Sequence, residues 1–280
     1  MSITIDALCD ADLEDAVALS TGEAWNQTSA DWRRLLRLGP DGCFGARIDG
    51  RLVATVTTTI YDCALAWIGM MIVHPSARRQ GIGMALMARA LEHLDTVGVS
   101  CIKLDATPAG LPLYRRLGFD EEVLFERWMG VATPTDAGAS MVSALHELDS
   151  VLALDRTAFG ADRSGFLAEL AADAASASAV CESDSNAVAY ALAREGRTAV
   201  YLGPIVATNC VNAARLFDAL IARFDTRQVC IDLNTAGLLD PSRLETAGLA
   251  PARPLMRMRR GGSSPGTAAT LCASAGPEYG

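Results

Sequence analysis

The chain has 280 residues, of which half are apolar and a fifth are charged, and its formal net charge is −9. This composition is typical of a globular protein with ample material for a core, and it excludes a surface built to bind nucleic acid, which needs clustered Lys and Arg. The length allows one large domain or two of ordinary size.

Nothing in the apolar pattern indicates a membrane segment, because apolar runs stop well before the roughly 18 residues that a membrane-spanning helix requires. The first residues lack the basic and apolar regions of a signal peptide, so we expect a cytoplasmic protein, present as a monomer or a homodimer. The eight cysteines form no C-x-x-C pair and only three histidines are present, so we expect buried thiols and no metal site.

The first half alternates strand and helix patterns. Asp49 and Gly50 form a hairpin turn between two apolar strands, and the strand that follows is apolar enough to be buried on both faces. The expected elements are, in order, a strand at 3–5, helices at 13–19 and 29–38, strands at 43–48, 52–61 and 65–73, a helix at 83–94, a strand at 101–104, a helix at 111–117 and a strand at 119–129.

A second run of elements follows residues 133–140, which have the composition of a linker. From about residue 263 to 280 the chain is rich in Gly, Ser, Pro and Ala, and we expect it to be disordered. The elements expected between them are helices at 145–159 and 166–174, strands at 188–194 and 200–206, a helix at 213–224 and strands at 229–233 and 255–258. We therefore predict domains at 1–132 and 141–262.

The two halves show a weak internal repeat. The strand at 68–73 aligns with the strand at 202–206, and the helices that follow also align. The second copy, however, is three residues shorter between its strand and its helix, and that connection contains no glycine. We therefore expect two copies of one fold, with a ligand-binding loop only in the first.

That loop is Arg78-Arg79-Gln80-Gly81-Ile82-Gly83. Glycines between a strand and a helix let backbone N–H groups approach a ligand, and the helix N-terminus behind them attracts negative charge. Together with two arginines, this combination suits a pyrophosphate.

The segment 71–83 resembles the signature of the GNAT superfamily of acetyl-CoA-dependent N-acetyltransferases, with Arg78, Gly81 and Gly83 at the matching positions. Residues 109–119 resemble the second landmark of that family, a Leu-Tyr-x-x-x-Gly-Phe pattern that contains Tyr114. Residues 154–163 and 203–207 look like a bacterial subgroup in which a degenerate, GNAT-like domain follows the catalytic one. The resemblance implies an α/β (α+β) protein of two tandem GNAT-like domains, each a mixed sheet flanked by helices.

The resemblance also implies a binding site for acetyl-CoA, the acyl donor. Where many relatives have an asparagine that contacts the pantetheine arm, this chain has Thr107, whose hydroxyl can make one such hydrogen bond. The implied cofactor-binding residues are Met71, Ile72, Val73, Arg78, Arg79, Gln80, Gly81, Ile82, Gly83, Met84, Thr107 and Gly110.

By the same resemblance, a backbone N–H of residues 71–73 would stabilise an oxyanion on the thioester. The acceptor amine would attack directly while both substrates are bound, and Tyr114 would donate a proton to the leaving thiolate. Asp105, which ends a strand near the expected site, is the predicted general base, with Glu23 and Asp62 as alternatives.

The acceptor pocket is expected between the first two helices, where Glu23, Trp25 and Asn26 offer a charge, an aromatic wall and an amide. The second domain would complete or cover this pocket, with Arg156 and Arg163 as candidate anchors for an anionic group. We predict an N-acetyltransferase that acts on a primary amine of a small molecule. The alternatives are a protein lysine acyltransferase and a non-catalytic sensor of acyl-CoA.

Overall fold

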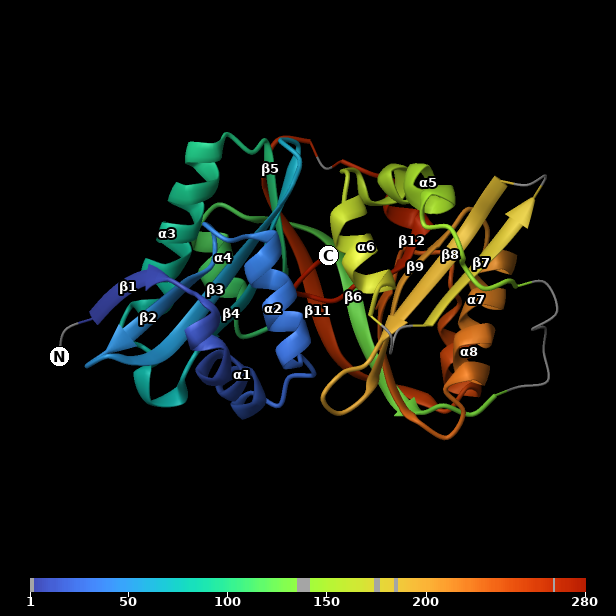
Figure 1. Cartoon of the computed structure of the whole chain (residues 1–280), viewed down its shortest axis with the longest axis horizontal. Coiled ribbons are helices and arrows are strands. Elements are labelled where there is room, and N and C mark those ends of the chain that lie inside the picture. Colours follow the sequence, from blue (N-terminus) through green and yellow to red (C-terminus); the bar gives the residue numbers. More distant parts are fainter. Residues whose placement is uncertain (1–2, 135–141, 174–176, 184–185, 264) are drawn as a thin grey trace.

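The computed structural model describes residues 3–134, 142–173, 177–183, 186–263 and 265–280. Within these residues the strands of both halves form one twelve-stranded mixed sheet, with helices on its two faces (Figure 1). The strand order is β1-β2-β3-β4-β5-β11-β6-β10-β12-β9-β8-β7. The predicted fold class, a mixed α/β fold, is confirmed.

The first half contributes four strands before the glycine loop at 78–83 and two after the helix that follows it. Its elements are β1 (Ile3–Ala7), α1 (Leu13–Gly22), α2 (Ser29–Leu38), β2 (Phe44–Ile48), β3 (Arg51–Tyr61), β4 (Leu65–Val73), α3 (Ile82–Val97), β5 (Cys101–Ala106), α4 (Leu111–Arg116) and β6 (Asp120–Val131). Most of these helices have clear end signals. The side chain of Thr28 caps α2, and left-handed glycines lie at both ends of α3.

The second half repeats the alternation and then adds a short strand. Its elements are α5 (Asp149–Phe159), α6 (Ser164–Ala171), β7 (Ala177–Ser183), β8 (Asn186–Arg194), β9 (Val200–Ala207), α7 (Cys210–Arg223), β10 (Gln228–Asn234), α8 (Pro241–Thr246), β11 (Leu249–Gly261) and β12 (Leu271–Ala273).

The two halves exchange their long terminal strands. β6, from the first half, pairs with β10 of the second, with Gln228 opposite Val131. β11, from the second half, lies between β5 and β6 and places Arg257 opposite Asp105. Each half therefore completes the sheet of the other, and residues of β11 reach the first half.

Side chains alternate between the two faces of this shared sheet. On one face, α1, α2, α5 and α6 contribute to a single apolar cluster that contains Trp67 of β4 and Tyr190 of β8. On the other face, α3 and α4 pack in one cluster around Leu86, and α7 and α8 pack in another around Leu216. One core therefore spans both halves.

The expectation of a disordered tail from residue 263 is wrong. β12 pairs with β9 and β10, and Tyr279 is completely buried. Small residues in this segment permit close packing, since a Cβ at Gly69 of β4 would come within 2.9 Å of the backbone of Glu278. The Gly, Ser and Ala content therefore reflects tight packing in this case.

The predicted domain limits remain a prediction, since residues 135–140 of the expected linker at 133–140 lie outside the described residues. Across the part of the chain that the structure describes, every helix is too short or too polar to cross a bilayer.

Candidate active site

Strands β4 and β5 separate beside the glycine loop. Their parallel pairing joins residues 65–67 to residues 101–103, and β4 then bulges at Met70, whose φ is +46°. The hydroxyl of Thr55 donates to the carbonyl oxygen of Met70 at 2.8 Å and holds the bulge. Residues 71–73 therefore present a backbone edge to the gap, which suits pairing with an extended ligand.

The loop after β4 combines left-handed backbone with a helix N-terminus. Arg79 has a φ of +61° and Gly81 a φ of +81°, and α3 begins directly after Gly81. This conformation is natural for glycine and exposes the first N–H groups of the helix, which attract anions. Gly83 packs over β4, since a Cβ there would lie 3.4 Å from the methyl group of Met71.

Side chains of the same loop fix its shape. Arg78 Nε donates to the carbonyl oxygen of Val73 at 2.9 Å, and its guanidinium pairs with Glu23. Gln80 Nε2 donates to the carbonyl oxygen of Ser76 at 3.2 Å. Two further predicted cofactor residues belong to the first turn of α3, namely Ile82, which is buried, and Met84, which is exposed.

Tyr114 faces the same gap from α4. Its ring packs edge-on against Phe119, with ring centroids 6.1 Å apart. Gly110 leaves room for the ring, because a Cβ there would come within 2.8 Å of Tyr114 Cε2. Burial raises the pKa of Tyr114 to about 12, so the phenol keeps its proton at neutral pH and is available as a donor.

A cavity of about 60 Å³ lies at the gap and brings predicted residues together. Those that line it are Trp25, Met71, Asp105, Thr107 and Tyr114. The rest of the polar wall is formed by Gln27, by Arg253 of β11 and by Glu278 of the last segment. The pocket is therefore built from three separate parts of the chain.

Asp105 is at the pocket but is held in an ion pair. Arg257 donates from Nε and Nη2 to the two carboxylate oxygens, each at 2.9 Å. The guanidinium of Arg257 also lies over the rings of Trp67 and Phe125. Burial raises the pKa of Asp105 and Arg257 opposes this shift. Because both oxygens already accept from one cation, this geometry favours a structural role over that of a base.

Replacing Asp105 with asparagine is expected to lower the free energy of unfolding by about 3 kcal/mol, because Arg257 is then buried without its counter-charge. Urea unfolding followed by circular dichroism measures this. The double variant Asp105→Leu, Arg257→Met removes both charges and is expected to recover most of the loss. An Asp105→Asn protein of wild-type stability with strongly reduced turnover would instead identify Asp105 as the base.

Asn26, predicted to bind the acceptor, serves another purpose. Its side chain accepts from the backbone N–H groups of Thr198 and Ala199, at 2.9 and 3.0 Å, and donates to the carbonyl oxygen of Ala199. All of these bonds reach the turn between β8 and β9, so Asn26 joins the two halves. Glu23 is likewise outside the pocket, paired with Arg78, and only Trp25 of the three predicted residues lines it.

Glu278 is the pocket residue that sequence reasoning missed most completely. Its Oε2 accepts from Gln27 Nε2 at 2.7 Å, and its Oε1 accepts from Arg194. Burial raises the pKa of Glu278, while Arg194 and the bond from Gln27 oppose the shift. Each carboxylate oxygen therefore has one strong donor and retains capacity to accept another.

The arginines expected to anchor an anionic group lie elsewhere. Arg163 is fully buried, pairs with Asp155 at 2.7 Å and donates to the carbonyl oxygen of Gly280 at 3.0 Å. Arg156 borders a different hollow, beside α5. No local motif marks Arg253 or Glu278, and the available signal was a lone charged residue among prolines or small residues.

In the second half the corresponding gap is filled by the chain itself. β9 and β10 pair in parallel at Val200 with Val229 and at Tyr201 with Cys230. Further along, β12 lies between these strands and pairs with both. The space that stays open between β4 and β5 is therefore closed between β9 and β10.

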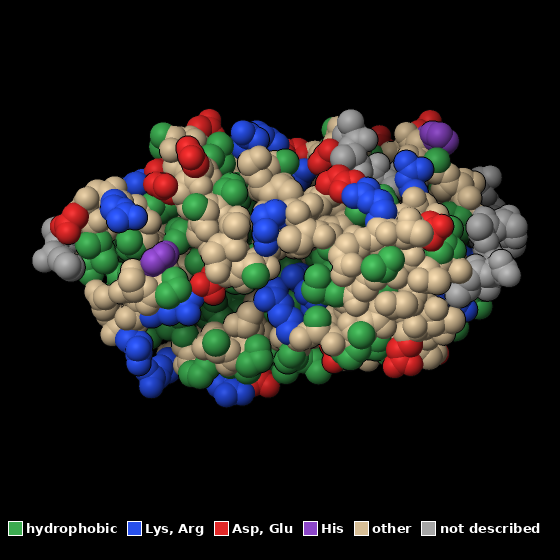
Figure 2. Space-filling model, turned by 90° about the horizontal axis from the view of Figure 1, so that it is seen from below, with side chains coloured by type: hydrophobic (Ala, Val, Ile, Leu, Met, Phe, Trp, Pro, Cys, Tyr) green, Lys and Arg blue, Asp and Glu red, His purple; other side chains and the backbone are tan. Residues whose placement is uncertain are grey.

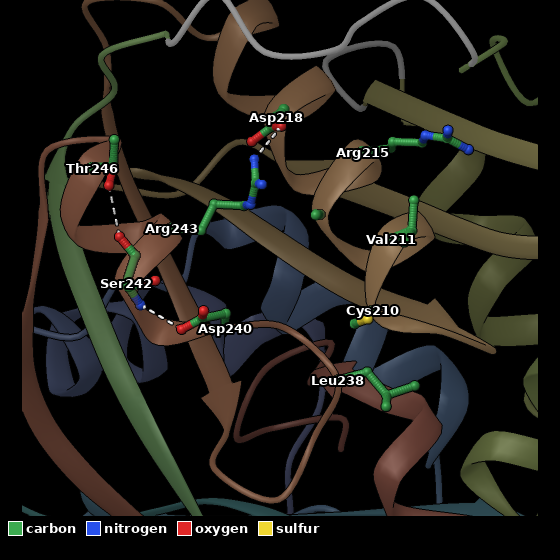
Figure 3. A pocket seen from close by; sticks show the side chains of 10 residues that line it. Cys210, Val211, Arg215, Asp218, Leu238, Asp240, Ser242, Arg243 and Thr246 are labelled. Atoms are coloured by element: carbon green, nitrogen blue, oxygen red, sulfur yellow. Dashed lines mark hydrogen bonds and ion pairs between the residues drawn. The ribbon is translucent and has the colours of Figure 1, made fainter.

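A hollow of about 750 Å³ remains between α7 and α8 (Figure 3). Arg243 of α8 points across it to Asp218 of α7, at 2.6 Å, and Cys210 and Leu238 lie at the other end. The turn into α7 is capped by the side chain of Asn209, which accepts from the backbone N–H of Asn212. This hollow lacks the left-handed glycine loop found before α3.

A split pair of strands, a glycine-bearing loop at a helix N-terminus and a buried phenol are together the parts of an acyltransferase site. Residues 6–119 match the model of the acetyltransferase (GNAT) family, and residues 151–271 match the model of an acetyltransferase (GNAT) domain. The chain therefore belongs to the GNAT family and is an acyltransferase with two GNAT domains in tandem.

Similar proteins support this assignment. The chain is 26% identical over 262 residues to the holothin acyltransferase of Pseudoalteromonas sp. (strain SANK 73390), covering 92% of this chain and 88% of that protein. A putative acetyltransferase from Pyrococcus horikoshii has the same fold, with a TM-score of 0.87, 22% identity and coverage of 99% and 96%. A tandem GNAT protein from the clavulanic acid biosynthesis pathway aligns with a TM-score of 0.66, at 16% identity, over 94% of this chain and 100% of that one.

Proposed function

We propose that this acyltransferase uses acetyl-CoA to acetylate a primary amine of a small molecule by direct attack in a ternary complex. The observation that carries the proposal is that Tyr114 and the bulged backbone at Met70 face one small cavity, with the glycine loop beside it. Acetyl-CoA would supply an activated thioester. The N–H groups of the loop at Arg79 and Gly81 would hold its pyrophosphate.

Each remaining task falls to a residue of the pocket. A backbone N–H of residues 71–73 would stabilise the negative charge that develops on the thioester oxygen. As the amine nitrogen bonds to the acyl carbon and the C–S bond breaks, Tyr114 would give its proton to the sulfur. We assign the amine proton to Glu278 in place of Asp105, because Glu278 retains lone-pair capacity at the cavity.

Replacing Glu278 with glutamine is expected to lower kcat about 10- to 100-fold, because the isosteric amide cannot take the proton. A carboxyl whose pKa is raised loses its base function as the pH falls toward that pKa. The wild-type rate should therefore decline on the acid side, and this decline should be absent in Glu278→Gln. Rates of thiol release between pH 5 and 9 measure both effects. Unchanged kcat with an unchanged acid limb would remove Glu278 from the mechanism.

The shape of the pocket favours a small-molecule acceptor over a protein lysine. Its walls come from both halves of the chain, and residues 277–278 close one side. A protein acceptor would need an open groove, whereas this cavity has a volume of only about 60 Å³ and is walled by several separate segments of the chain. Retention of Tyr114 beside the loop argues against a pure sensor of acyl-CoA.

The decisive experiment measures free thiol released from acetyl-CoA with a panel of acceptors. The panel includes amino acids, amino sugars, polyamines and holothin, the last taken from the name of a relative. Amine-dependent release above hydrolysis is expected with at least one class. Release that no amine increases would contradict the proposed function.

A further inference from the structure

The side chain of Arg253 is half-buried and has no direct counter-ion. Among the described residues this side chain makes no ion pair and no hydrogen bond, and its Nε is buried without a partner. It lies on β11 opposite Arg127, whose guanidinium is already bound to Asp232 at 2.6 and 2.7 Å. Burial and the like charge of Arg127 both lower the pKa of Arg253, and the carboxylates of Asp232 and Glu278 oppose this shift. An unpaired cation in this position destabilises the free protein.

The buried cations near the pocket each have a direct carboxylate partner. These pairs are Arg257 with Asp105, Arg127 with Asp232, Arg194 with Glu278 and with Asp31, and Lys103 with Glu122. Arg253, which lines the cavity itself, has no such partner among the described residues.

Hydrogen-bond acceptors line another part of the same cavity wall. Within the part of the chain that the structure describes, the buried Gln27 Oε1 accepts no hydrogen bond, while Gln27 Nε2 donates to Glu278. Gln27 Oε1 and the Glu278 carboxylate can each accept a hydrogen bond from a ligand, and both residues line the cavity. They suit a donor-rich group such as an amine, whereas Arg253 suits an anion.

We infer that the acceptor is an amino-carboxylate compound, whose carboxylate binds Arg253 and whose amine lies against Glu278 and Gln27. This rests on the proposed function and specifies its substrate class. A guanidinium binds a planar carboxylate through two parallel N–H donors, and a desolvated site strengthens the contact. The bound carboxylate supplies the direct partner that Arg253 lacks.

Positive charge also gathers beside a hollow on one face of the molecule. Figure 2 views the lower side of Figure 1 and shows a hollow near the middle of that face, with Lys and Arg side chains beside it. Clustered positive charge near a cleft raises the local concentration of anionic ligands, although the protein as a whole is acidic, with a net charge of −9.

The test uses matched acceptor pairs that differ only in the carboxylate. Glycine, β-alanine, L-glutamate and L-phenylalanine are each compared with the corresponding carboxamide, in the presence of acetyl-CoA and with thiol release as the readout. The amides have the more easily deprotonated amines, so intrinsic reactivity works against the inference. For at least one pair, kcat/KM of the wild type is expected to favour the acid about 10- to 100-fold, as charge-assisted hydrogen bonds do.

Arg253→Met should remove this preference by lowering kcat/KM for the acid while leaving that of the amide unchanged. Arg253→Lys should retain part of it. Arg260→Met is the matched control, because Arg260 is on the same strand, outside the pocket, and pairs with Asp95 at 3.4 Å. Arg260→Met should leave kcat/KM unchanged for both the acid and the amide.

Stability gives a readout that does not depend on turnover. Arg253→Met should unfold at or above the wild-type Tm, because it removes a half-buried charge that has no direct partner. A Tm lowered by several degrees would make Arg253 a structural residue and overturn the inference.

The kinetic outcomes separate the inference from the function on which it rests. If Arg253→Met lowered kcat/KM equally for the acid and the amide, Arg253 would act on the acyl donor and not on the acceptor. That result would overturn the inference. Acetylation only of amides or of other amines that lack a carboxylate would also overturn the inference. It would leave the proposed acetyltransferase function intact. If no amine is acetylated, both fail together.

Discussion

Replacing Tyr114 with phenylalanine is expected to lower kcat about 100- to 1,000-fold while acetyl-CoA binds with nearly unchanged affinity. The variant keeps the ring that packs on Phe119 and fills the space above Gly110, and it loses only the hydroxyl. Without that proton donor, the thiolate must leave unprotonated. Stopped assays of thiol release give kcat, and isothermal titration with acetyl-CoA gives the affinity.

The effect of pH on this variant provides a second check. Because burial raises the pKa of Tyr114 to about 12, the phenol stays protonated from pH 6 to pH 10. The ratio of wild-type to variant kcat should therefore be constant across this range. Tyr61→Phe is the matched control, since the hydroxyl of Tyr61 donates to the carbonyl oxygen of Tyr279 at 2.9 Å, outside the pocket. Wild-type turnover in Tyr114→Phe would exclude the proton-donor role.

Local patterns predicted several elements of the first half, including the strand before the glycine loop. The helix at 29–38 and the strand at 65–73 agree with α2 and β4 to the residue, because caps, stops and apolar runs are local signals. The loop at 78–83 and Tyr114 belong to one contiguous strand–loop–helix–strand–helix unit. Its residues meet within a short stretch of chain, so a sequence motif can describe the site.

The elements that close the pocket depend on pairings between distant residues. β11 was predicted only at 255–258, because Pro251 and Pro254 interrupt its pattern, although it extends from Leu249 to Gly261. β7 was missed because its residues are mainly Ala and Ser, with little β-branched or aromatic signal. No local feature could show that β11 pairs with β5, about 150 residues earlier.

The same limit explains why the acceptor side was only partly predicted. Asp105 was correctly expected near the site, but its partner Arg257 lies on the exchanged strand, and that ion pair changes its role. Asn26 has the residue type of a substrate ligand, yet the turn at Thr198 uses its whole amide. Residues that meet across the two halves must be placed by the fold before their chemistry can be assigned.

Tyr279 anchors the last segment of the chain between the two halves. The ring lies 4.6 Å, centroid to centroid, from that of Phe166, and its hydroxyl donates to the carbonyl oxygen of Asp31 at 2.9 Å. Arg34 donates to the same hydroxyl at 3.3 Å. Tyr279 therefore joins α2 of the first half to α6 of the second and holds Glu278 at the pocket.

Replacing Tyr279 with alanine is expected to lower the free energy of unfolding by about 3–5 kcal/mol, because a fully buried ring leaves a cavity at the junction of the halves. Tm should fall by roughly 6–15 °C. Tyr279→Phe keeps the ring and should cost only about 1 kcal/mol. Differential scanning calorimetry measures both. If Tyr279→Ala melted within 2 °C of the wild type, the segment would not be part of the folded core, and Glu278 could not be held beside Tyr114.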